Sequence, residues 1–283
     1  MPKRVSTARG REFGACVRAA IAAAGLTSRA AAEILNWDEA KVSDVVNGKG
    51  GVSEVEVALL LGVCRVRATE VARLLKLYGG MDVRGWWQQH GTCTPILPRT
   101  VVEHLKLAET LTVWHTHAVP LFLQTADYML EVLIASSTSP ADELQERIEA
   151  QLAMQGLLRR DVRCTIYVHE LALRLPIGSD EVQAEQLLHL MFMANRPNMA
   201  IRIVPAARGA HAGMAGPFTR LSFAKYEPMV WVETENSSLF FERADAINGY
   251  EKVIGSLDAG ALDEIESKAL VFQQYDTLRA ARG

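Results

Sequence analysis

Cysteine is scarce in this sequence, and its spacing excludes two common classes of small domain. The 283 residues hold four cysteines, Cys16, Cys64, Cys93 and Cys164, and no two of them form a Cys-x-x-Cys pair. Disulfide-stapled domains are short and dense in cysteine, and structural zinc sites draw their ligands from closely spaced pairs. The sequence therefore predicts neither a disulfide framework nor a structural zinc site.

Long apolar runs are absent as well. The segment Val57–Cys64 is among the longest, and Arg65 ends it, whereas a membrane helix needs about 20 apolar residues. The basic start MPKRVSTARGRE leads into no apolar core of a signal peptide. With 49% hydrophobic and 22% charged residues the composition is that of a globular protein. We therefore expect a cytoplasmic protein that does not bind a membrane.

The motifs of common enzyme classes are missing too. The sequence has no Walker loop, no Rossmann glycine fingerprint, no nucleophile elbow and no His-Glu-x-x-His motif. His115-x-His117 lacks a third ligand at suitable spacing, which favours a structural role over a metal site. His169-Glu170 and His211 fit an acid–base site or a ligand pocket equally well. We expect no enzyme activity, no metal and no cofactor.

What the sequence does have is an uneven distribution of charge. Residues 1–80 hold 12 lysines and arginines against 8 acidic residues, whereas the rest of the chain holds 18 against 25. A basic N-terminal part and an acidic remainder predict two functions, with any polyanion bound by the first part. The excess of positive charge is modest, so the inference depends on the motifs that follow.

Turn and capping residues divide the first eighty residues into short helices. Gly25 is placed to end the first helix, Thr27 or Ser28 to begin the second, and Asp38 to begin the third. Ser53 begins a fourth helix with Glu56 at its third position. Five short helices with a tight turn between two of them are typical of a helix-turn-helix domain. The expected helices are Glu12–Ala24, a segment from Thr27-Ser28 to Leu35, Glu39–Val46, Glu54–Leu61 and Arg67–Leu77.

In such a domain the second helix of the motif lies in the major groove of DNA, with its first residues toward the bases. We expect Glu39, Ala40, Lys41 and Ser43 to face outward there. A small helical bundle without a DNA function fits these residues equally well. The core that fixes the angle between the helices is expected to hold Ile34, Leu35, Trp37, Val42 and Val45.

Several short motifs, all in one order, carry a family resemblance. They are Gly25-Leu26-Thr27, then Ala32…Leu35-Asn36-Trp37, then Lys41-Val42-Ser43…Asn47-Gly48…Val52-Ser53. They resemble the Cro/CI-type, or xenobiotic-response-element (XRE), helix-turn-helix family. The resemblance is to actinobacterial transcriptional regulators whose recognition helix carries a Ser-Lys-Ile/Val-Ser core. Phe13-Gly14…Val17-Arg18 is similar to the first helix of that family.

After residue 80 the pattern of elements becomes mixed. We expect a helix-turn-helix domain over 1–80, a linker over 81–97 and an α+β domain over 98–283, behind an all-α N-terminal domain. Arg84-Gly85-Trp86-Trp87 in the linker is expected to pack against the second domain. The expected helices are Arg99–Val119, Ala126–Ala135, Pro140–Leu158, Glu181–Ala194, Arg243–Leu257 and Ala259–Ala281. The expected strands are Val162–Val168, Met199–Val204, Phe218–Phe223, Met229–Val232 and Ser238–Phe241.

The C-terminal part resembles the same regulators. Their C-terminal domain carries a segment similar to Val119-Pro120-Leu121-Phe122-Leu123-Gln124-Thr125-Ala126-Asp127-Tyr128, with Leu121 here in place of a glycine. His169-Glu170, Ile203-Val204-Pro205, Gly216-Pro217-Phe218 and Val232-Glu233 follow in the family's order. The resemblance implies a transcriptional regulator whose antitoxin-like C-terminal domain mediates dimerisation and responds to a signal. It also implies a small protein as a partner.

The residues expected to contact double-stranded DNA lie on or beside the two helices of the motif. Hydroxyl and amide groups at Thr27 and Ser28 suit phosphates, and Arg29 and Lys49 supply positive charge. The basic residues Lys3, Arg4, Arg9 and Arg11 fit either an arm that reaches the DNA backbone or minor groove, or a solubilising tail. The full set of expected contacts is Thr27, Ser28, Arg29, Glu39, Ala40, Lys41, Ser43, Asn47 and Lys49.

Carboxylates on the third helix leave a second function open. Asp38, Glu39 and Asp44 outnumber Lys41 there and repel phosphate, although Glu39 can accept from a cytosine amino group. We therefore expect a homodimer whose protomers bind DNA weakly by themselves. The alternative is an antitoxin-like protein-interaction module with weak or no DNA binding. A small-molecule effector of the C-terminal domain is compatible with both interpretations.

Overall fold

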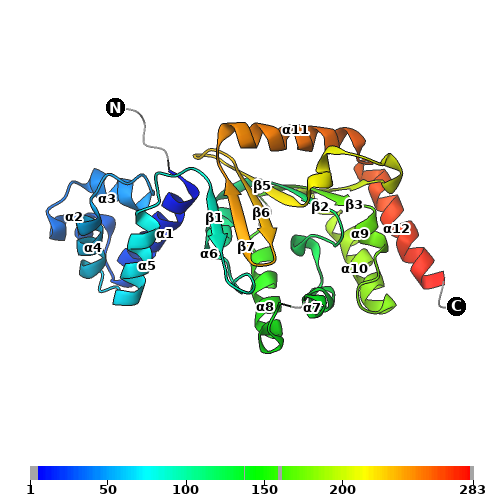
Figure 1. Cartoon of the computed structure of the whole chain (residues 1–283), viewed down its shortest axis with the longest axis horizontal. Helices are drawn as coiled ribbons and strands as arrows, with labels where there is room; N and C mark the ends of the chain where they lie inside the picture. Colours follow the sequence, from blue (N-terminus) through cyan, green and yellow to red (C-terminus); the bar gives the residue numbers. More distant parts are fainter. Residues whose placement is uncertain (1–5, 137, 159–160, 281–283) are drawn as a thin grey trace. The chain divides into compact units, whose positions relative to one another are not determined.

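In the computed structural model, which describes residues 6–136, 138–158 and 161–280, the expected capping residues begin the N-terminal helices. The side chains of Thr27, Asp38 and Ser53 each accept a hydrogen bond from a backbone N–H in the first turn that follows. The first helix begins earlier than predicted, because Thr7 caps it. The helices are α1 (Ala8–Ala23), α2 (Ser28–Leu35), α3 (Glu39–Val46), α4 (Glu54–Val63) and α5 (Ala68–Tyr78) (Figure 1).

The contact between α1 and α3 is close because glycines stand at it. A β-carbon on Gly14 would lie 2.5 Å from the Val46 carbonyl oxygen, and one on Gly10 would lie 2.4 Å from the Gly48 carbonyl oxygen. Gly48 itself has a φ of +66°, which favours glycine. Arg18 of α1 donates a hydrogen bond to the same Val46 oxygen at 2.7 Å. The backbone of α1 therefore fixes the C-terminal end of α3.

The five helices enclose one apolar core. Val42 and Val45 of α3 are fully buried in it, as predicted, and Leu35 and Trp37 pack against it partly buried. The prediction for Ile34 is wrong, because its side chain is 57% exposed. The face of α2 that meets the core is formed by Ala31, Ala32 and Leu35, and Ile34 lies to one side of that face.

Seven strands form one mixed sheet in the order β1-β7-β6-β5-β2-β3-β4 (Figure 1). Strand β2 pairs in parallel with β3, and β3 with β4, whereas β2 with β5 and β5 with β6 are antiparallel pairs. The strands are β1 (Trp86–Gln89), β2 (Ala108–His115), β3 (Arg163–His169), β4 (Met199–Val204), β5 (Phe218–Phe223), β6 (Met229–Thr234) and β7 (Ser237–Phe241). An all-α N-terminal region followed by an α+β region confirms the predicted fold class.

The predicted helix over 99–119 is wrong in its second half. Helix α6 (Arg99–Leu107) ends at residue 107, and β2 begins at the next residue. The segment from 108 to 115 contains Thr110, Thr112 and Val113, whose β-branched side chains favour strands. Both faces of β2 are buried, since the consecutive residues Val113 and Trp114 point to opposite faces and are both buried. The strand therefore lacks the alternation of polar and apolar residues that marks a strand in a sequence.

In the C-terminal part of the chain, helices cover both faces of the sheet. Phe218 of β5 packs against Tyr250 of α11, with ring centroids 4.8 Å apart, and the Tyr167 hydroxyl donates to Asp258 of the same helix at 2.7 Å. Figure 1 shows α7 and α8 on the opposite side.

In the described ranges no helix is both long and apolar enough to cross a bilayer. The remaining helices are α7 (Ala126–Ala135), α8 (Leu144–Gln155), α9 (Leu171–Arg174), α10 (Asp180–Met193), α11 (Ala244–Gly260) and α12 (Glu264–Ala280).

The contacts within the chain define two units. The N-terminal unit comprises Met1–Trp86, Arg99–His104 and Phe240–Arg243. The C-terminal unit comprises Trp87–Pro98, Leu105–Leu239 and Ala244–Gly283. Two short segments that are remote in sequence thus complete the helical N-terminal unit, at the start of α6 and at the end of β7. The predicted linker over 81–97 contains strand β1, and its Trp86 packs against Phe240 with ring centroids 6.2 Å apart.

Candidate nucleic-acid interface

The residues expected to contact DNA lie on the outer side of α2 and α3 and on the turn after α3. We call this set, Thr27, Ser28, Arg29, Glu39, Ala40, Lys41, Ser43, Asn47 and Lys49, the α2–α3 surface. Lys41 and Asn47 are half-buried, and the other seven are exposed. The opposite side of α3, with Val42, Val45 and Val46, is buried in the core. The fold thus brings the predicted residues together, and which of them contact DNA stays a prediction.

Arg29 links α2 to the start of α3. Its Nε lies 3.1 Å from the Glu33 carboxylate and 3.3 Å from the Glu39 carboxylate, and the side chain is 74% exposed. Ion pairs this exposed contribute only about 0–1 kcal/mol to stability, because water solvates both charges well. Arg29 can therefore leave these carboxylates for a phosphate at little cost.

Lys41 has a different environment. Its ammonium forms an ion pair with Glu56 and lies 4.5 Å from the centroid of the Trp37 ring. Hydrogen bonds from Lys41 and from the Ser53 backbone N–H lower the pKa of Glu56 to about 2, so this carboxylate stays charged. Glu56 also completes a capping box with Ser53, as the sequence indicated. Lys41 thus ties α3 to the start of α4 before any phosphate is present.

The end of α3 carries the remaining polar groups. Lys49 lies 3.5 Å from the Asp44 carboxylate, and the Asn47 side chain donates to the Ser43 carbonyl oxygen at 2.7 Å. Each of the three cations on the α2–α3 surface is therefore paired with a carboxylate of the same unit. The pairs of Arg29 with Glu39 and of Lys49 with Asp44 partly neutralise the acidic residues of α3, whose charges repel phosphate.

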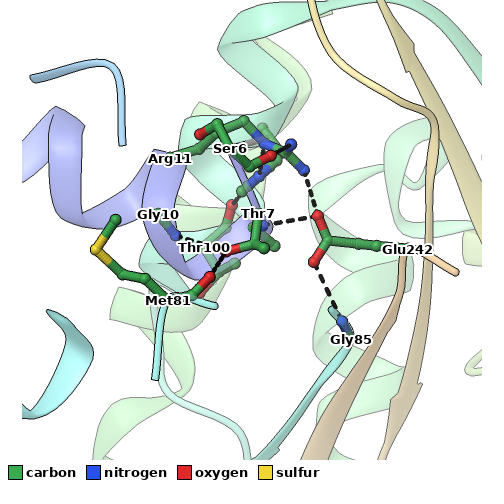
Figure 2. Close-up of polar contacts among 10 residues, drawn as sticks. Ser6, Thr7, Gly10, Arg11, Met81, Gly85, Thr100 and Glu242 are labelled. Carbon is green, nitrogen blue, oxygen red and sulfur yellow. Dashed lines mark hydrogen bonds and ion pairs between the residues drawn. The ribbon is translucent and has the colours of Figure 1, made fainter. Parts of the chain in front are cut away.

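The predicted basic arm is wrong at Arg9 and Arg11. Arg11 is buried with Glu242, and its Nη2 lies 2.9 Å from the Glu242 carboxylate (Figure 2). Its Nε donates to His104 at 2.8 Å and its Nη1 to the Ser6 carbonyl oxygen at 2.8 Å. Arg9 lies 4.8 Å from the centroid of the Trp86 ring. Lys3 and Arg4 lie outside the described residues.

The groups around Arg11 form a buried polar network in the N-terminal unit, which we call the Arg11 cluster: Ser6, Thr7, Arg11, Thr100, His104 and Glu242. The Glu242 carboxylate also accepts hydrogen bonds from the backbone N–H groups of Ala8, at 2.7 Å, and Gly85, at 3.3 Å (Figure 2). The Thr7 hydroxyl donates to the Met81 carbonyl oxygen at 2.6 Å. The first turn of α1 is thus held by residues from distant parts of the chain.

His104 is neutral in this cluster. Its Nδ1 donates to the Thr100 carbonyl oxygen at 2.6 Å, which leaves Nε2 to accept from Arg11. Burial, with the nearby positive charge of Arg11, lowers the pKa of His104 to about 3. The cluster cannot be predicted from the sequence, because Arg11 and Glu242 are 231 residues apart and no local pattern marks a contact of that range.

The structure brings together two histidines of the C-terminal unit that the sequence analysis singled out. The rings of His169 and His211 stack with centroids 5.7 Å apart, and burial lowers the pKa of both. Glu170, however, pairs with Arg174 and accepts from the Ala206 backbone N–H at 2.8 Å, so it supports the local backbone. Within the described residues no group of three His, Cys, Asp or Glu side chains is arranged to hold a metal.

Comparison with known families identifies both parts of the chain. Residues 12–82, which include both helices, match a family described as a helix-turn-helix domain, and this match supports a DNA-binding regulator. Residues 98–273, more than half of the chain, match a family described as a domain of unknown function, DUF5753. The chain belongs to the DUF5753 family. A search of curated proteins finds no match to it.

The DUF5753 range and the N-terminal unit overlap. Thr100, His104 and Glu242 lie within the range that matches DUF5753, yet they belong to the N-terminal unit through the Arg11 cluster. Arg11 itself lies one residue before the helix-turn-helix match. The helical unit of this DUF5753 protein is therefore built from more than its helix-turn-helix segment.

Proposed function

We propose that this DUF5753 protein is a sequence-specific transcriptional regulator of the actinobacterial XRE type, and not an enzyme. It binds double-stranded DNA as a homodimer through the α2–α3 surface, in the cytoplasm, and its C-terminal domain controls the binding. The observation that carries the proposal is the outer side of α3, where Ala40 and Ser43 are exposed on a helix whose other side is fixed in the core.

Exchange of ion pairs reconciles the acidic α3 with a polyanion. Arg29 and Lys49 are exposed cations whose present partners, Glu39 and Asp44, hold them weakly. On a duplex both cations turn to phosphates and release counterions, which drives association at low salt. Lys41 stays with Glu56 and Trp37 and keeps α3 in place.

The Arg11 cluster supports control through the C-terminal domain. Thr100 and His104 at the start of α6 and Glu242 after β7 hold the first turn of α1, and α1 in turn fixes the end of α3 through Gly14 and Arg18. A signal that moves the start of α6 or the residues after β7 changes how the first turn of α1, and through it α3, is held. Coupling between two sites requires an element of this kind, which both sites can move.

Charge placed on α3 tests the proposed interface. The duplex is selected from fragments of the host genome by retention on the purified protein. Fluorescence anisotropy then measures the affinity of the protein for this duplex. The double variant Ala40→Glu/Ser43→Glu puts two carboxylates against the phosphates and should abolish binding. The matched control Thr69→Glu/Ala72→Glu puts the same charges at the same spacing on exposed positions of α5 and should retain it. Equal binding by the two variants would refute the interface.

A protein-interaction module of the antitoxin-like type is the second candidate. Ile34 of α2 and Val55 and Leu59 of α4 are large, exposed apolar side chains on the N-terminal unit, and exposed apolar groups are typical of protein interfaces. A stoichiometric small protein that co-purifies, together with no duplex binding at low salt, would favour this function over DNA binding.

A further inference from the structure

A cavity of about 360 Å³ lies in the C-terminal unit, on the face of the sheet opposite α11. Its floor is a row of cross-strand neighbours, since Val113 of β2 pairs with Thr219 of β5, and Thr219 pairs with Trp231 of β6. The segment 120–122 and Val132 of α7 line the other side. This volume is at the small end of the range for pockets that bind small molecules.

The strand period places two titratable groups in the same pocket. His115 follows Val113 by two residues and Glu233 follows Trp231 by two, so both lie on the cavity face, and both line the cavity. Glu235 lies beyond the end of β6 and accepts hydrogen bonds from Ser136, at 2.8 Å, and from Thr138. Among the described residues that line the cavity there is no lysine or arginine. The pocket therefore offers negative charge and no positive charge.

The apolar part of the lining is aromatic. Phe122 and Trp231 line the cavity with aliphatic side chains around them. The Trp231 side chain is 4% exposed, and its indole N–H has no hydrogen-bond partner among the described residues. Electron-rich ring faces and a carboxylate together are the environment that organic cations prefer in proteins.

We propose that this cavity binds a small organic amine in its protonated form, with the ammonium paired to Glu233 and an apolar, preferably aromatic, body packed against Trp231 and Phe122. Anions of the same shape are excluded by Glu233 and Glu235. The binding site depends only on the C-terminal unit. Its use as the effector site of a DNA-binding regulator rests on the proposed function.

The protonation of the pocket makes binding depend on pH. Desolvation by the cavity lining raises the pKa of Glu233, although solvent still reaches this residue, and burial lowers the pKa of His115 to about 4. The Thr138 and Ser136 hydroxyls lower the pKa of Glu235. Near neutral pH His115 is uncharged, and Glu233 is easier to protonate than an ordinary glutamate. A cation selects the ionised form of Glu233, so its affinity rises from pH 6 to pH 8.

Three probes with one indole body and different charge test the proposal on the full chain. Isothermal titration calorimetry at pH 8 compares tryptamine, a cation, with tryptophol, a neutral alcohol, and indole-3-propionate, an anion. We expect tryptamine to bind at least about tenfold more tightly than tryptophol, the usual gain from a charge-assisted contact, and indole-3-propionate not to bind. No binding of tryptamine at millimolar concentration, or equal affinity for all three probes, would overturn the proposal.

A conservative variant assigns the effect to Glu233. Glu233→Gln should reduce tryptamine affinity to that of tryptophol and remove its rise between pH 6 and pH 8, while tryptophol binding persists and reports an intact pocket. The matched control Glu227→Gln removes a carboxylate at an exposed position outside the lining and should behave as the wild type. Unchanged tryptamine affinity in Glu233→Gln would contradict the assignment.

DNA binding is a separate measurement. If the cavity is the effector site, saturating tryptamine shifts the affinity for the retained duplex in the wild type and not in Glu233→Gln. Tryptamine binding without any such shift would leave the ligand site in place and overturn its use as an effector site. Absence of duplex binding with or without tryptamine would overturn the proposed function and leave the calorimetric result unaffected.

Discussion

The α2–α3 surface and the Arg11 cluster lie in the same unit and use the same residue types for opposite purposes. Arg29 pairs with Glu39 in water, whereas Arg11 pairs with Glu242 at side-chain exposures of 2% and 7%. Both distances are near 3 Å, so geometry does not distinguish the pairs. Their solvent exposure distinguishes them. Water can solvate Arg29 when Glu39 is absent, whereas no water reaches Arg11 to take the place of Glu242. A weakly paired surface cation remains available to DNA, and a buried one becomes part of the fold.

Removal of Glu242 should have the largest effect. Glu242→Ala leaves the Arg11 charge buried without its carboxylate and frees the N–H groups of Ala8 and Gly85, so we expect a loss of about 3–5 kcal/mol in the free energy of unfolding. Urea denaturation followed by circular dichroism measures it. The exposed control Glu33→Ala should lose less than about 1 kcal/mol. Equal losses for the two variants would remove the contrast between buried and exposed pairs.

Gly14→Ala should rank second. The added methyl group would meet the Val46 carbonyl oxygen at 2.5 Å, so α1 and α3 must separate, at a cost of about 1–3 kcal/mol, and α3 should bind DNA less well. Gly62→Ala is a matched control in α4, because no atom lies within 4 Å of its new β-carbon. That control should be neutral or stabilising by up to about 1 kcal/mol. Thermal melts measure the stability of both variants, and anisotropy titrations measure their affinity for DNA. Equal stability and equal affinity of the two variants would contradict the close contact of α1 with α3.

Acid should weaken the Arg11 cluster through His104. Its folded-state pKa lies well below the unfolded value near 6.5, so the unfolded chain takes up a proton first and stability falls as pH drops below 6.5. The interval from pH 6.5 to pH 5.5 corresponds to about 1 kcal/mol, because the unfolded histidine is already half protonated at pH 6.5. Melting curves at pH 6.5 and 5.5 should therefore differ more in the wild type than in His104→Gln, which cannot titrate. The same pH sensitivity in both proteins would show that His104 is not the group responsible.

The smallest effect on stability is expected at Glu39. Glu39→Gln removes an exposed partner of Arg29 and should change the free energy of unfolding by less than about 0.5 kcal/mol. DNA affinity should rise, because a repulsive carboxylate is lost and Arg29 is released. A fall in affinity would indicate instead that Glu39 accepts a hydrogen bond from a base.

Local chemistry explains which parts of the fold could be predicted from the sequence. The caps at Thr27, Asp38 and Ser53 act within three residues of themselves, so the bounds of α2 and α3 were predicted correctly. Strand β2 was missed because its identity depends on neighbours on both edges. The same reason applies to the Arg11 cluster, whose members come from α1, α6 and the chain after β7.

In the candidate sites, too, local features could be predicted from the sequence and contacts between separate elements could not. Exposure on the outer side of α3 follows from helical period and could be predicted, whereas the ion pairs of Lys41 with Glu56 and Arg29 with Glu39 join separate helices. The apolar side chain of Ile34 predicts a core position, but Ala31 and Ala32 fill that face of α2. The pocket around Glu233 arises from strand register, which residue types alone do not specify.

The salt dependence of duplex binding tests the ion-pair exchange most directly. The slope of log affinity against log salt is measured for the wild type, for Arg29→Gln/Lys49→Gln, and for Lys225→Gln/Lys252→Gln, which removes two exposed charges from the C-terminal unit. Each phosphate contact contributes about one unit of slope, so we expect the first double variant to lose about two units and the second to match the wild type. An unchanged slope in Arg29→Gln/Lys49→Gln would contradict DNA binding through the α2–α3 surface.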